Sequence, residues 1–426
     1  MSRVTGDDAT YRAQIARLFE RSPFYRDKLR AVGFDAAEKV GGLERIAELP
    51  FTEKDELRKS QTEHPPLGSH AAIDISQAAR IYSTSGTSGA PLYIPLTEAD
   101  IRDWLEIARA SYSRNGLKAG DRLVTTYGAG PLVAGATLAA FEAIGVTHVP
   151  VGAGNTERLL AALRLLRPQA LACTPSYAMY IAEAAEAKGW PVKQAGVERI
   201  LVAGEPGGGE ESFRRKIEAA FGARVYEVMG IGDIAASLWG ECEAQSGMHF
   251  SGGGIIHAEL VDPESGKPVP LADGATGELA YTHLRREAAP LLRFRSRDHV
   301  RVWASRCACG ADTLRVRCIG RTDDMLIVRG VNVFPSAVRE VVARFAPRVT
   351  GAVQIRPRAR GVKQEPPLPV LVEVADGQGA DPVLAASIAK EIRDTLVFTP
   401  EVRLVAPQAL PRSDYKSKLV DFTESS

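Results

Sequence analysis

Residues 83–89, with the sequence STSGTSG, bring hydroxyl and glycine side chains together in one loop. Glycine lets backbone amides come close to a phosphate group, and the hydroxyls of serine and threonine add hydrogen-bond donors. The segment lacks the lysine of the nucleotide-binding loop G-x-x-x-x-G-K-[ST], so it is not that motif. On its own it is compatible with a phosphate cradle and equally with a polar, flexible loop.

Cysteine and histidine form a second candidate set. Cys307 and Cys309 lie in RCACG, and Cys242 and His249 lie in ECEAQSGMH. Three thiolates and one imidazole would suit a tetrahedral zinc ion. Because Cys-x-Cys is a less usual spacing for zinc ligands than Cys-x2-Cys, free thiols remain the open alternative from the residues alone.

The elements that must position these residues show a clear order along the chain. Between residues 121 and 229, short apolar strands alternate with helical segments, from DRLVTTY to ARVYEVM. Such alternation predicts a parallel sheet covered by helices, with ligands bound at the carboxyl ends of its strands. After residue 246, turn signals between strand-like runs indicate antiparallel structure.

We therefore expect an α/β fold in two domains. The N-terminal domain, 1–322, would have helix-covered, mostly parallel sheets and an antiparallel β subregion. The C-terminal domain, 323–426, would be a small α+β unit that begins within GRTDD. Neither an internal repeat nor a low-complexity segment interrupts this organisation.

Two local helix signals can be tested directly. In LPFTEKDELRKS, Thr52 is the expected N-cap of a short helix. In LTEADIRDWLEIARASYSRNG, Thr97 is the expected N-cap of a longer helix. Ile101, Leu105 and Ala108 would form the buried stripe of that longer helix.

Composition limits the classes of partner. The chain has 426 residues, 45% of them hydrophobic and 25% charged, and a net charge of +1. This balance gives no basic surface for nucleic acid, and no apolar run approaches the length of a membrane span. With no apolar signal core at its N-terminus and few cysteines, the sequence is that expected of a cytoplasmic protein.

Several motifs, taken in order, resemble the acyl-adenylating enzymes. After STSGTSG come AGEPGGGE, YEVMGIGD, LRFRSRD, GRTDDMLIVRGVNVFP and LPRSDYKSK. The segments SPFYRDKL, LPFTEKDELR, TPSYAMYIAEAAEAKG and DDMLIVRGVNVFPSAVRE resemble the phenylacetate–coenzyme A ligase branch of that family. The resemblance extends over nearly the whole chain.

This resemblance implies a reaction in two halves. An aryl carboxylate would attack the α-phosphorus of ATP to form an acyl-adenylate and pyrophosphate. Coenzyme A would then displace AMP to give a thioester. Mg²⁺ would assist, because phosphoryl transfer depends on positioning and on charge stabilisation. The family resemblance also implies a mobile C-terminal domain and a possible homodimer.

The resemblance assigns roles to individual residues. Lys416 matches the mobile catalytic lysine, although Tyr415 precedes it where the family usually has glycine. Asp298 matches the residue that binds the ribose hydroxyls, Arg321 the arginine that follows it to the nucleotide, and Asp323 the hinge. The phosphate loop would comprise Ser83, Thr84, Ser85, Gly86, Thr87, Ser88 and Gly89. The adenine and acyl sites would include Glu205, Pro206, Tyr127, Gly128, Gly130, Ala203, Gly204 and Gly230.

The motif MGIGD departs from the family pattern, an aromatic residue followed by G-x-[ST]-E. Met229 replaces the tyrosine that stacks on adenine, and Gly232 replaces the hydroxyl residue. Asp233 replaces the glutamate that contacts Mg²⁺. Aspartate also offers oxygen ligands to a hard cation, but its side chain is shorter by one methylene.

The resemblance favours a structural zinc at Cys242, His249, Cys307 and Cys309, positions that match those of many members of the branch. The expected activity is thus that of an AMP-forming aryl-acid–coenzyme A ligase using ATP, Mg²⁺ and coenzyme A. One alternative is an adenylating enzyme that passes the aryl group to a carrier protein or an amine. Another is a catalytically silent nucleotide-binding homologue, an alternative that the MGIGD departure keeps open.

Overall fold

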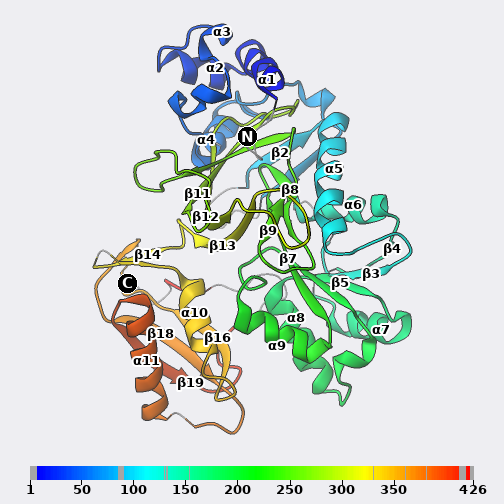
Figure 1. The fold of residues 1–426 in the computed structure, drawn as a ribbon, viewed down its shortest axis with the longest axis vertical. Helices are drawn as coiled ribbons and strands as arrows, with labels where there is room; N and C mark the ends of the chain where they lie inside the picture. The colour runs from blue at the N-terminus through cyan, green and yellow to red at the C-terminus, as the bar shows by residue number, and fades with distance from the viewer. Residues whose placement is uncertain are drawn as a thin grey trace. The chain divides into compact units, whose positions relative to one another are not determined.

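The computed structural model describes residues 7–84, 91–128, 130, 133–152, 154–329, 331–359, 361–379, 381–411 and 419–422. The protein is a mixed α/β structure (Figure 1). It has a large mixed sheet and a smaller C-terminal part, which confirms the predicted fold class.

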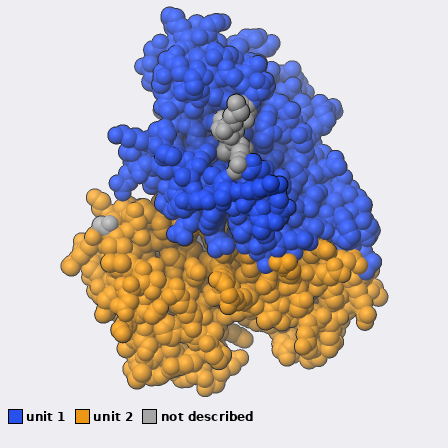
Figure 2. Space-filling view, in the orientation of Figure 1, with its two compact units in different colours: residues 1–152, 226–317 blue, residues 153–225, 318–426 orange. Residues whose placement is uncertain are grey.

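Packing divides the chain into two compact units (Figure 2). Unit 1 comprises Met1–Gly152 and Tyr226–Arg317, and unit 2 comprises Ala153–Val225 and Cys318–Ser426. Each unit thus combines an earlier and a later stretch of the chain. The boundary between residues 322 and 323 stays a prediction.

Unit 1 holds the first helices and most of the antiparallel strands. Its helices are α1 (Asp8–Arg21), α2 (Pro23–Arg30), α3 (Ala37–Val40), α4 (Lys54–Glu63), α5 (Glu98–Arg114) and α6 (Ala136–Ile144), with 3-10 turns η1 (Leu43–Glu48), η2 (Ile75–Gln77) and η3 (Val133–Gly135). Its strands are β1 (Arg80–Ser83), β2 (Tyr93–Leu96), β3 (Arg122–Thr125), β4 (Thr147–Pro150), β7 (Arg224–Ile231), β8 (Ala235–Glu241), β9 (Met248–Phe250), β10 (Ile256–Val261), β11 (Thr276–His283), β12 (Phe294–Trp303) and β13 (Arg315–Arg321). The first residues of β7 and the last of β13 belong to unit 2.

Strand pairing in unit 1 is of both kinds. Strand β3 is parallel to β4, whereas β8 is antiparallel to both β7 and β9. Strand β11 pairs antiparallel with β10 and β12, and β9 pairs antiparallel with β13. Helix α5 packs against β8 (Figure 1). The core between them includes Trp104, Ile107, Leu238 and Trp239.

Helix α5 begins as predicted, and its predicted inner stripe is confirmed at two of three positions. Thr97 is its N-cap, and its side chain accepts a hydrogen bond from the backbone N–H of Asp100. The buried positions include Trp104, Ile107 and Ala108, whereas Ile101 and Leu105 are only half-buried. Ile101 nevertheless packs against the core, so the predicted stripe was wrong at Leu105, where the neighbouring Trp104 side chain enters the core instead.

The predicted N-cap of α4 was also wrong. Glu53 is the N-cap, and it forms a capping box with Glu56. The Thr52 hydroxyl instead donates a hydrogen bond to the backbone oxygen of Leu292 (2.6 Å). A contact between distant segments has therefore taken the hydroxyl that local sequence would assign to the helix end.

Unit 2 contains a parallel strand pair and the C-terminal α+β region. Its helices are α7 (Thr156–Leu166), α8 (Pro175–Glu186), η4 (Val192–Ala195), α9 (Glu211–Phe221), α10 (Pro335–Ala343) and α11 (Pro382–Leu396). Its strands are β5 (Ala170–Cys173), β6 (Arg199–Val202), β14 (Leu326–Val328), β15 (Val331–Val333), β16 (Val349–Ile355), β17 (Lys363–Gln364), β18 (Leu368–Val374) and β19 (Pro400–Val405).

The C-terminal region of unit 2 has its own apolar core. Strand β18 lies between antiparallel β16 and parallel β19. Helix α10 packs against β16, and α11 packs against β19. Buried valine, leucine and isoleucine side chains from these strands and helices fill the space between them. Among the described residues, no helix has the length and apolar character needed to cross a membrane.

Candidate functional site

Asp233 lies in the tight turn between β7 and β8 of unit 1. Strand β7 pairs with β8 in a register that joins Met229 to Trp239 and Ile231 to Ala235. The backbone N–H of Ile234 donates to the carbonyl oxygen of Ile231 (2.8 Å), which closes the turn. The turn holds the Asp233 side chain 6% exposed, so its carboxylate is removed from most of the solvent.

Asp233 has one paired and one unpaired carboxylate oxygen. Lys54, the first residue of α4, donates from Nζ to Asp233 Oδ2 (2.8 Å). The other oxygen, Oδ1, is buried and meets no hydrogen-bond partner among the residues that the structure describes. A buried carboxylate oxygen without a partner is energetically costly, and a hard cation binds through such oxygens. The donor set at this point therefore fits Mg²⁺.

The two glycines of MGIGD differ in what surrounds them. A Cβ atom on Gly230 would lie 1.9 Å from the carbonyl oxygen of Ala236, so no side chain fits there. A Cβ on Gly232 would lie 3.4 Å from Val133 Cγ2 and 3.6 Å from Thr84 Cγ2, which are ordinary contacts. The turn thus requires glycine at 230 but not at 232, the position where the family has a hydroxyl residue.

The base of the predicted phosphate loop is a β-hairpin. Strand β1 pairs antiparallel with β2, and Ser83 is opposite Tyr93. The backbone N–H of Thr84 donates to the Leu92 carbonyl oxygen (3.0 Å), and the Leu92 N–H donates to the Thr84 hydroxyl (3.4 Å). Ser85, Gly86, Thr87, Ser88 and Gly89 lie outside the described residues. Thr84 approaches the Asp233 turn through the Gly232 contact.

Strand β12 carries the LRFRSRD segment and is fixed by buried ion pairs. Arg293 forms two hydrogen bonds with Glu259 (3.1 and 2.9 Å), and Arg295 forms two with Glu278 (3.0 and 2.7 Å). Asp298 is buried on the same strand, and its N–H donates to the Ser296 hydroxyl (3.1 Å). The predicted ribose ligand is therefore held on a strand that is rigidly tied to its neighbours.

The proposed acyl and adenine positions fall in both units. In unit 1, Tyr127 is buried after β3, whereas Gly128 and Gly130 are exposed. In unit 2, Ala203 and Gly204 follow β6, and Gly204 has a φ of +98°, a left-handed conformation that favours glycine.

The AGEPGGGE segment of unit 2 is tied to two helices. Glu205 accepts a hydrogen bond from the Ser176 N–H in α8 (2.8 Å). Arg339 of α10 donates to the Pro206 carbonyl oxygen (2.6 Å) and to both carboxylate oxygens of Glu210 (3.0 and 2.7 Å). Burial alone would lower the pKa of Arg339, but the charge of Glu210 outweighs it and raises that pKa.

Two residues that the sequence assigns to separate roles are paired with each other. Arg321 donates from Nε to Asp323 Oδ1 (2.9 Å) and from Nη2 to Asp323 Oδ2 (2.7 Å). The pair is about half exposed, at 40% and 51% for the two side chains, so its net worth is small. Lys416 lies outside the described residues, and its catalytic role stays a prediction.

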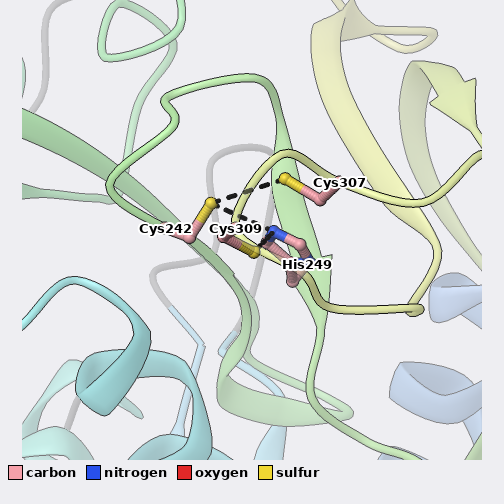
Figure 3. A group of neighbouring side chains, drawn as sticks. All are labelled: Cys242, His249, Cys307 and Cys309. Atoms are coloured by element: carbon pink, nitrogen blue, oxygen red, sulfur yellow. Dashed lines mark hydrogen bonds between the residues drawn. The ribbon is translucent and has the colours of Figure 1, made fainter.

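The four predicted metal ligands come together in unit 1 (Figure 3). Cys242 follows β8, His249 lies in β9, and Cys307 and Cys309 lie between β12 and β13. The ligand atoms all lie within 4.8 Å of one another. Cys242 Sγ is 3.7 Å from Cys307 Sγ and 3.2 Å from His249 Nε2, and Cys309 Sγ is 3.6 Å from His249 Nε2. Two sulfur ligands at about 2.3 Å from a tetrahedral zinc ion lie about 3.8 Å apart, which agrees with this geometry.

The ligands of the cluster differ in protonation. Burial, followed by the charges of Arg114 and Arg315, lowers the pKa of His249 to about 4, so the imidazole is neutral at neutral pH. Burial raises the pKa of Cys242 to about 12, whereas hydrogen bonds from the Cys309 backbone and from Ser246 outweigh burial and lower the pKa of Cys307 to about 7. A bound cation would stabilise the thiolate forms of both cysteines.

Sequence reasoning did not single out Lys54 or Thr313. Lys54 occurs in LPFTEKDELR, one of the segments that resemble the phenylacetate branch, but its Asp233 partner is 179 residues away. The Thr313 hydroxyl lies 2.7 Å from His249 Nδ1, and this contact leaves Nε2 directed at the cysteines. No local pattern in the sequence indicates either contact.

Comparisons with known proteins agree with this arrangement. The family described as AMP-binding enzyme matches residues 21–283, and the AMP-binding enzyme C-terminal domain matches residues 330–421. The phenylacetate–coenzyme A ligase of Thermus thermophilus is 34% identical over 94% of this chain and 92% of its own. That of Pseudomonas putida is 29% identical over 96% and 93%.

A solved structure is similar over almost the whole chain. It is 2-hydroxyisobutyryl-CoA ligase in its postadenylation state, in complex with R3-HIB-AMP. It is 27% identical, with a TM-score of 0.88 over 97% of this chain and 88% of that one. The ordered motifs, the Asp233 turn and these matches lead to one conclusion: the chain belongs to the AMP-binding enzyme family, as an acyl-adenylate-forming ligase of the phenylacetate–coenzyme A ligase branch.

Proposed function

We propose that this protein activates an aryl carboxylic acid with ATP and transfers the acyl group to coenzyme A. The observation that carries the proposal is the buried Asp233 carboxylate, with one oxygen unpartnered among the described residues, beside the hairpin that begins the STSGTSG loop. This combination would offer an oxygen ligand for a cation near Thr84, at the start of the predicted phosphate loop, and nucleotide chemistry requires both.

The first half-reaction forms an acyl-adenylate. A carboxylate oxygen of the acid attacks the α-phosphorus of ATP, and the bond to the bridging oxygen breaks to release pyrophosphate. Loop 83–89 would bind the β- and γ-phosphates, and Asp298 would accept hydrogen bonds from the ribose hydroxyls. Met229 would pack against adenine, and the roles of Glu205 and Pro206 in adenine binding stay predictions from their own motif. A bound Mg²⁺ would supply positive charge to the phosphates through Asp233 Oδ1.

The second half-reaction forms the thioester. The thiolate of coenzyme A attacks the acyl carbon, and AMP leaves with the electron pair of the broken acyl–oxygen bond. Lys416 would act in adenylation, where an ammonium offsets the charge of two approaching anions. Arg321 would bind the nucleotide, and Asp323 would be the hinge between the half-reactions. Their mutual ion pair uses Nε and Nη2 of Arg321.

We also propose that Cys242, His249, Cys307 and Cys309 hold a structural zinc ion. The supporting observations are the closeness of the ligand atoms, which all lie within 4.8 Å of one another, and the neutral imidazole. With four protein ligands the ion has no open position for substrate, so its contribution is to the stability of the fold. The homodimer and the cytoplasmic location stay predictions, which light scattering of the purified chain and cell fractionation test.

Pyrophosphate release with Mg-ATP tests the proposed function. The acids are phenylacetate, benzoate, their hydroxy and amino derivatives, and 2-hydroxyisobutyrate, each with and without coenzyme A. Mass spectrometry identifies the products. The expected result is acid-dependent release with an aryl acid, and a thioester only when coenzyme A is present.

Other outcomes of that assay separate the alternatives. Release without a coenzyme A thioester indicates a carrier protein or an amine as the acceptor. Release only with 2-hydroxyisobutyrate makes the substrate a small branched acid and contradicts the aryl assignment. ATP binding without release for any acid identifies a silent homologue and contradicts the proposed enzyme.

A further inference from the structure

Lys54 lies beside the predicted metal-binding carboxylate without having been assigned any role. Its Nζ is 2.8 Å from Asp233 Oδ2, and its side chain is 30% exposed whereas that of Asp233 is 6% exposed. Building on the function proposed above, we propose that Lys54 is a positioning residue for Asp233. It occupies one carboxylate oxygen, directs the other to a divalent cation, and offsets part of the negative charge that attracts that cation.

The position of Lys54 is fixed by hydrogen bonds of Thr52, two residues before it. Thr52 exchanges backbone hydrogen bonds with β12, donating to the Arg293 carbonyl oxygen (3.1 Å) and accepting from the Arg295 N–H (3.1 Å). The Thr52 hydroxyl adds its bond to Leu292. Because Lys54 begins α4 two residues later, the helix start is attached to the same strand that carries Asp298.

Glu53 reinforces this attachment. Its carboxylate accepts a hydrogen bond from Arg297 Nη2 of β12 (2.6 Å), and its backbone N–H donates to Glu56 Oε2 (2.8 Å). Arg297 itself has a φ of +66°, so the strand is distorted where it meets α4. Lys54 therefore reaches Asp233 from a helix end that several hydrogen bonds hold in place.

Of the two cations near Asp233, Lys54 forms a hydrogen bond with it and Arg286 interacts with it only through its charge. Arg286 is also close enough to interact with Asp233 through its charge, but its guanidinium lies 3.5 Å from Asp100 and over the Trp104 ring. Lys54 donates to Oδ2 alone. The remaining Oδ1 is the oxygen that meets no partner within the described part of the chain, so one-point binding of a cation is the geometry left open.

The charge of Lys54 should lower the affinity of Asp233 for a divalent cation. An ammonium and a divalent cation on the same carboxylate repel each other, so Lys54 weakens cation binding while it orients the carboxylate. Replacing Lys54 by methionine keeps the length of the aliphatic chain and removes the charge. The K54M variant should then bind a divalent cation about tenfold more tightly than wild type, because a unit charge a few ångströms away changes ion binding by at least that factor in a partly buried site.

Titration of the purified full-length chain with Mn²⁺, followed by electron paramagnetic resonance, measures this effect without turnover. Wild type, K54M, K54R and D233N are compared, with K118M as the matched control. Lys118 also pairs with a carboxylate that is 6% exposed, Asp121, at 3.1 Å, in the turn that precedes β3. We expect tighter Mn²⁺ binding for K54M, wild-type affinity for K54R and K118M, and loss of the site in D233N.

Three results would overturn the inference. One is a K54M affinity equal to or weaker than that of wild type, and another is an equal gain in affinity in K118M. The third is no Mn²⁺ binding by either wild type or K54M. Circular dichroism checks the folding of each variant, and K54R retains a charged partner for Asp233 if K54M does not fold. An enzyme that releases no pyrophosphate contradicts the proposed function, whereas these binding results decide the role of Lys54 separately.

Discussion

The Cys242–His249–Cys307–Cys309 cluster and the Lys54–Asp233 pair are two polar centres of unit 1, and they differ in how completely their donor atoms are used. In the cluster, all four ligand atoms lie within 4.8 Å of one another, so all four could bind one ion. In the pair, one carboxylate oxygen is bound by Lys54 and the other has no partner among the described residues. A closed donor set stabilises the fold, whereas an open one can take part in chemistry.

Unit 2 provides a useful reference for this comparison. Arg339 and Glu210 form a buried ion pair in which both carboxylate oxygens accept hydrogen bonds from the guanidinium. Burial of a charged pair therefore does not by itself indicate a functional site. In contrast to Glu210, Asp233 has a buried oxygen that meets no partner among the described residues. Variants of the two centres in unit 1 should therefore separate effects on stability from effects on activity.

The largest expected effect is on stability, from loss of the metal in the cluster. The C307S variant should lose zinc and unfold at a markedly lower temperature, since structural zinc sites contribute binding free energies on the order of 10 kcal/mol to folding. Metal content by mass spectrometry and thermal unfolding by circular dichroism measure both effects. C318S is the matched control, because Cys318 lies outside the cluster. Equal zinc content and equal unfolding temperatures in C307S and C318S would contradict a structural zinc.

The next largest effect is on activity, from the open centre. D233N removes the charge and one oxygen ligand while it keeps nearly the same shape. We expect pyrophosphate release to fall by about 100-fold to 1,000-fold, the range found when one preorganised electrostatic contact to a transition state is lost. Zinc content should stay at the wild-type level. A D233N enzyme with wild-type pyrophosphate release would show that the carboxylate is not part of the reaction.

A smaller effect tests the turn that carries Asp233. G230A places a methyl group 1.9 Å from the Ala236 carbonyl oxygen, so we expect a loss of about 1–3 kcal/mol in the free energy of unfolding. G232A meets only ordinary contacts and should fold like wild type. Urea unfolding of the two variants measures the difference. Equal stabilities would contradict the close approach of β7 and β8 at Gly230.

The smallest effect concerns the orientation of a ligand in the closed centre. T313V removes the hydroxyl that contacts His249 Nδ1 but keeps a similar shape. We expect zinc affinity to fall by about tenfold to 100-fold, as for other contacts that orient a metal-binding histidine. Competition with a chelator of known affinity measures it. Pyrophosphate release at saturating zinc should be unchanged, and a T313V protein with wild-type zinc affinity would remove this role.

Much of the fold followed from local patterns in the sequence. The alternation of strands and helices between residues 121 and 229 predicted the parallel pairs β3–β4 and β5–β6. Thr97 was correctly identified as an N-cap because the capping interaction spans only three residues. The family was identified from six motifs and their order along the chain. Each motif is a local sequence pattern, so no knowledge of the three-dimensional structure was needed.

Failures of prediction occurred where distant segments compete with local preference. The Thr52 hydroxyl suits a helix cap, but a bond to Leu292, 240 residues away, takes it. The inner stripe of α5 was wrong at Leu105 because the neighbouring Trp104 enters the core instead, where it donates a hydrogen bond to the Ile234 carbonyl oxygen and contacts the Arg286 guanidinium. Hydrophobic periodicity indicates that a helix has a buried face but fixes its direction only approximately.

By itself, the sequence determined the family, the fold class and the residue types available for chemistry. The tertiary structure alone decided which of those residues meet. It gathered four ligands from three segments of unit 1 into one cluster, and it brought Lys54 to Asp233 across 179 residues. The physical reason is that strand pairing and helix docking set the distances between side chains, and these long-range contacts leave no periodic signal in the sequence.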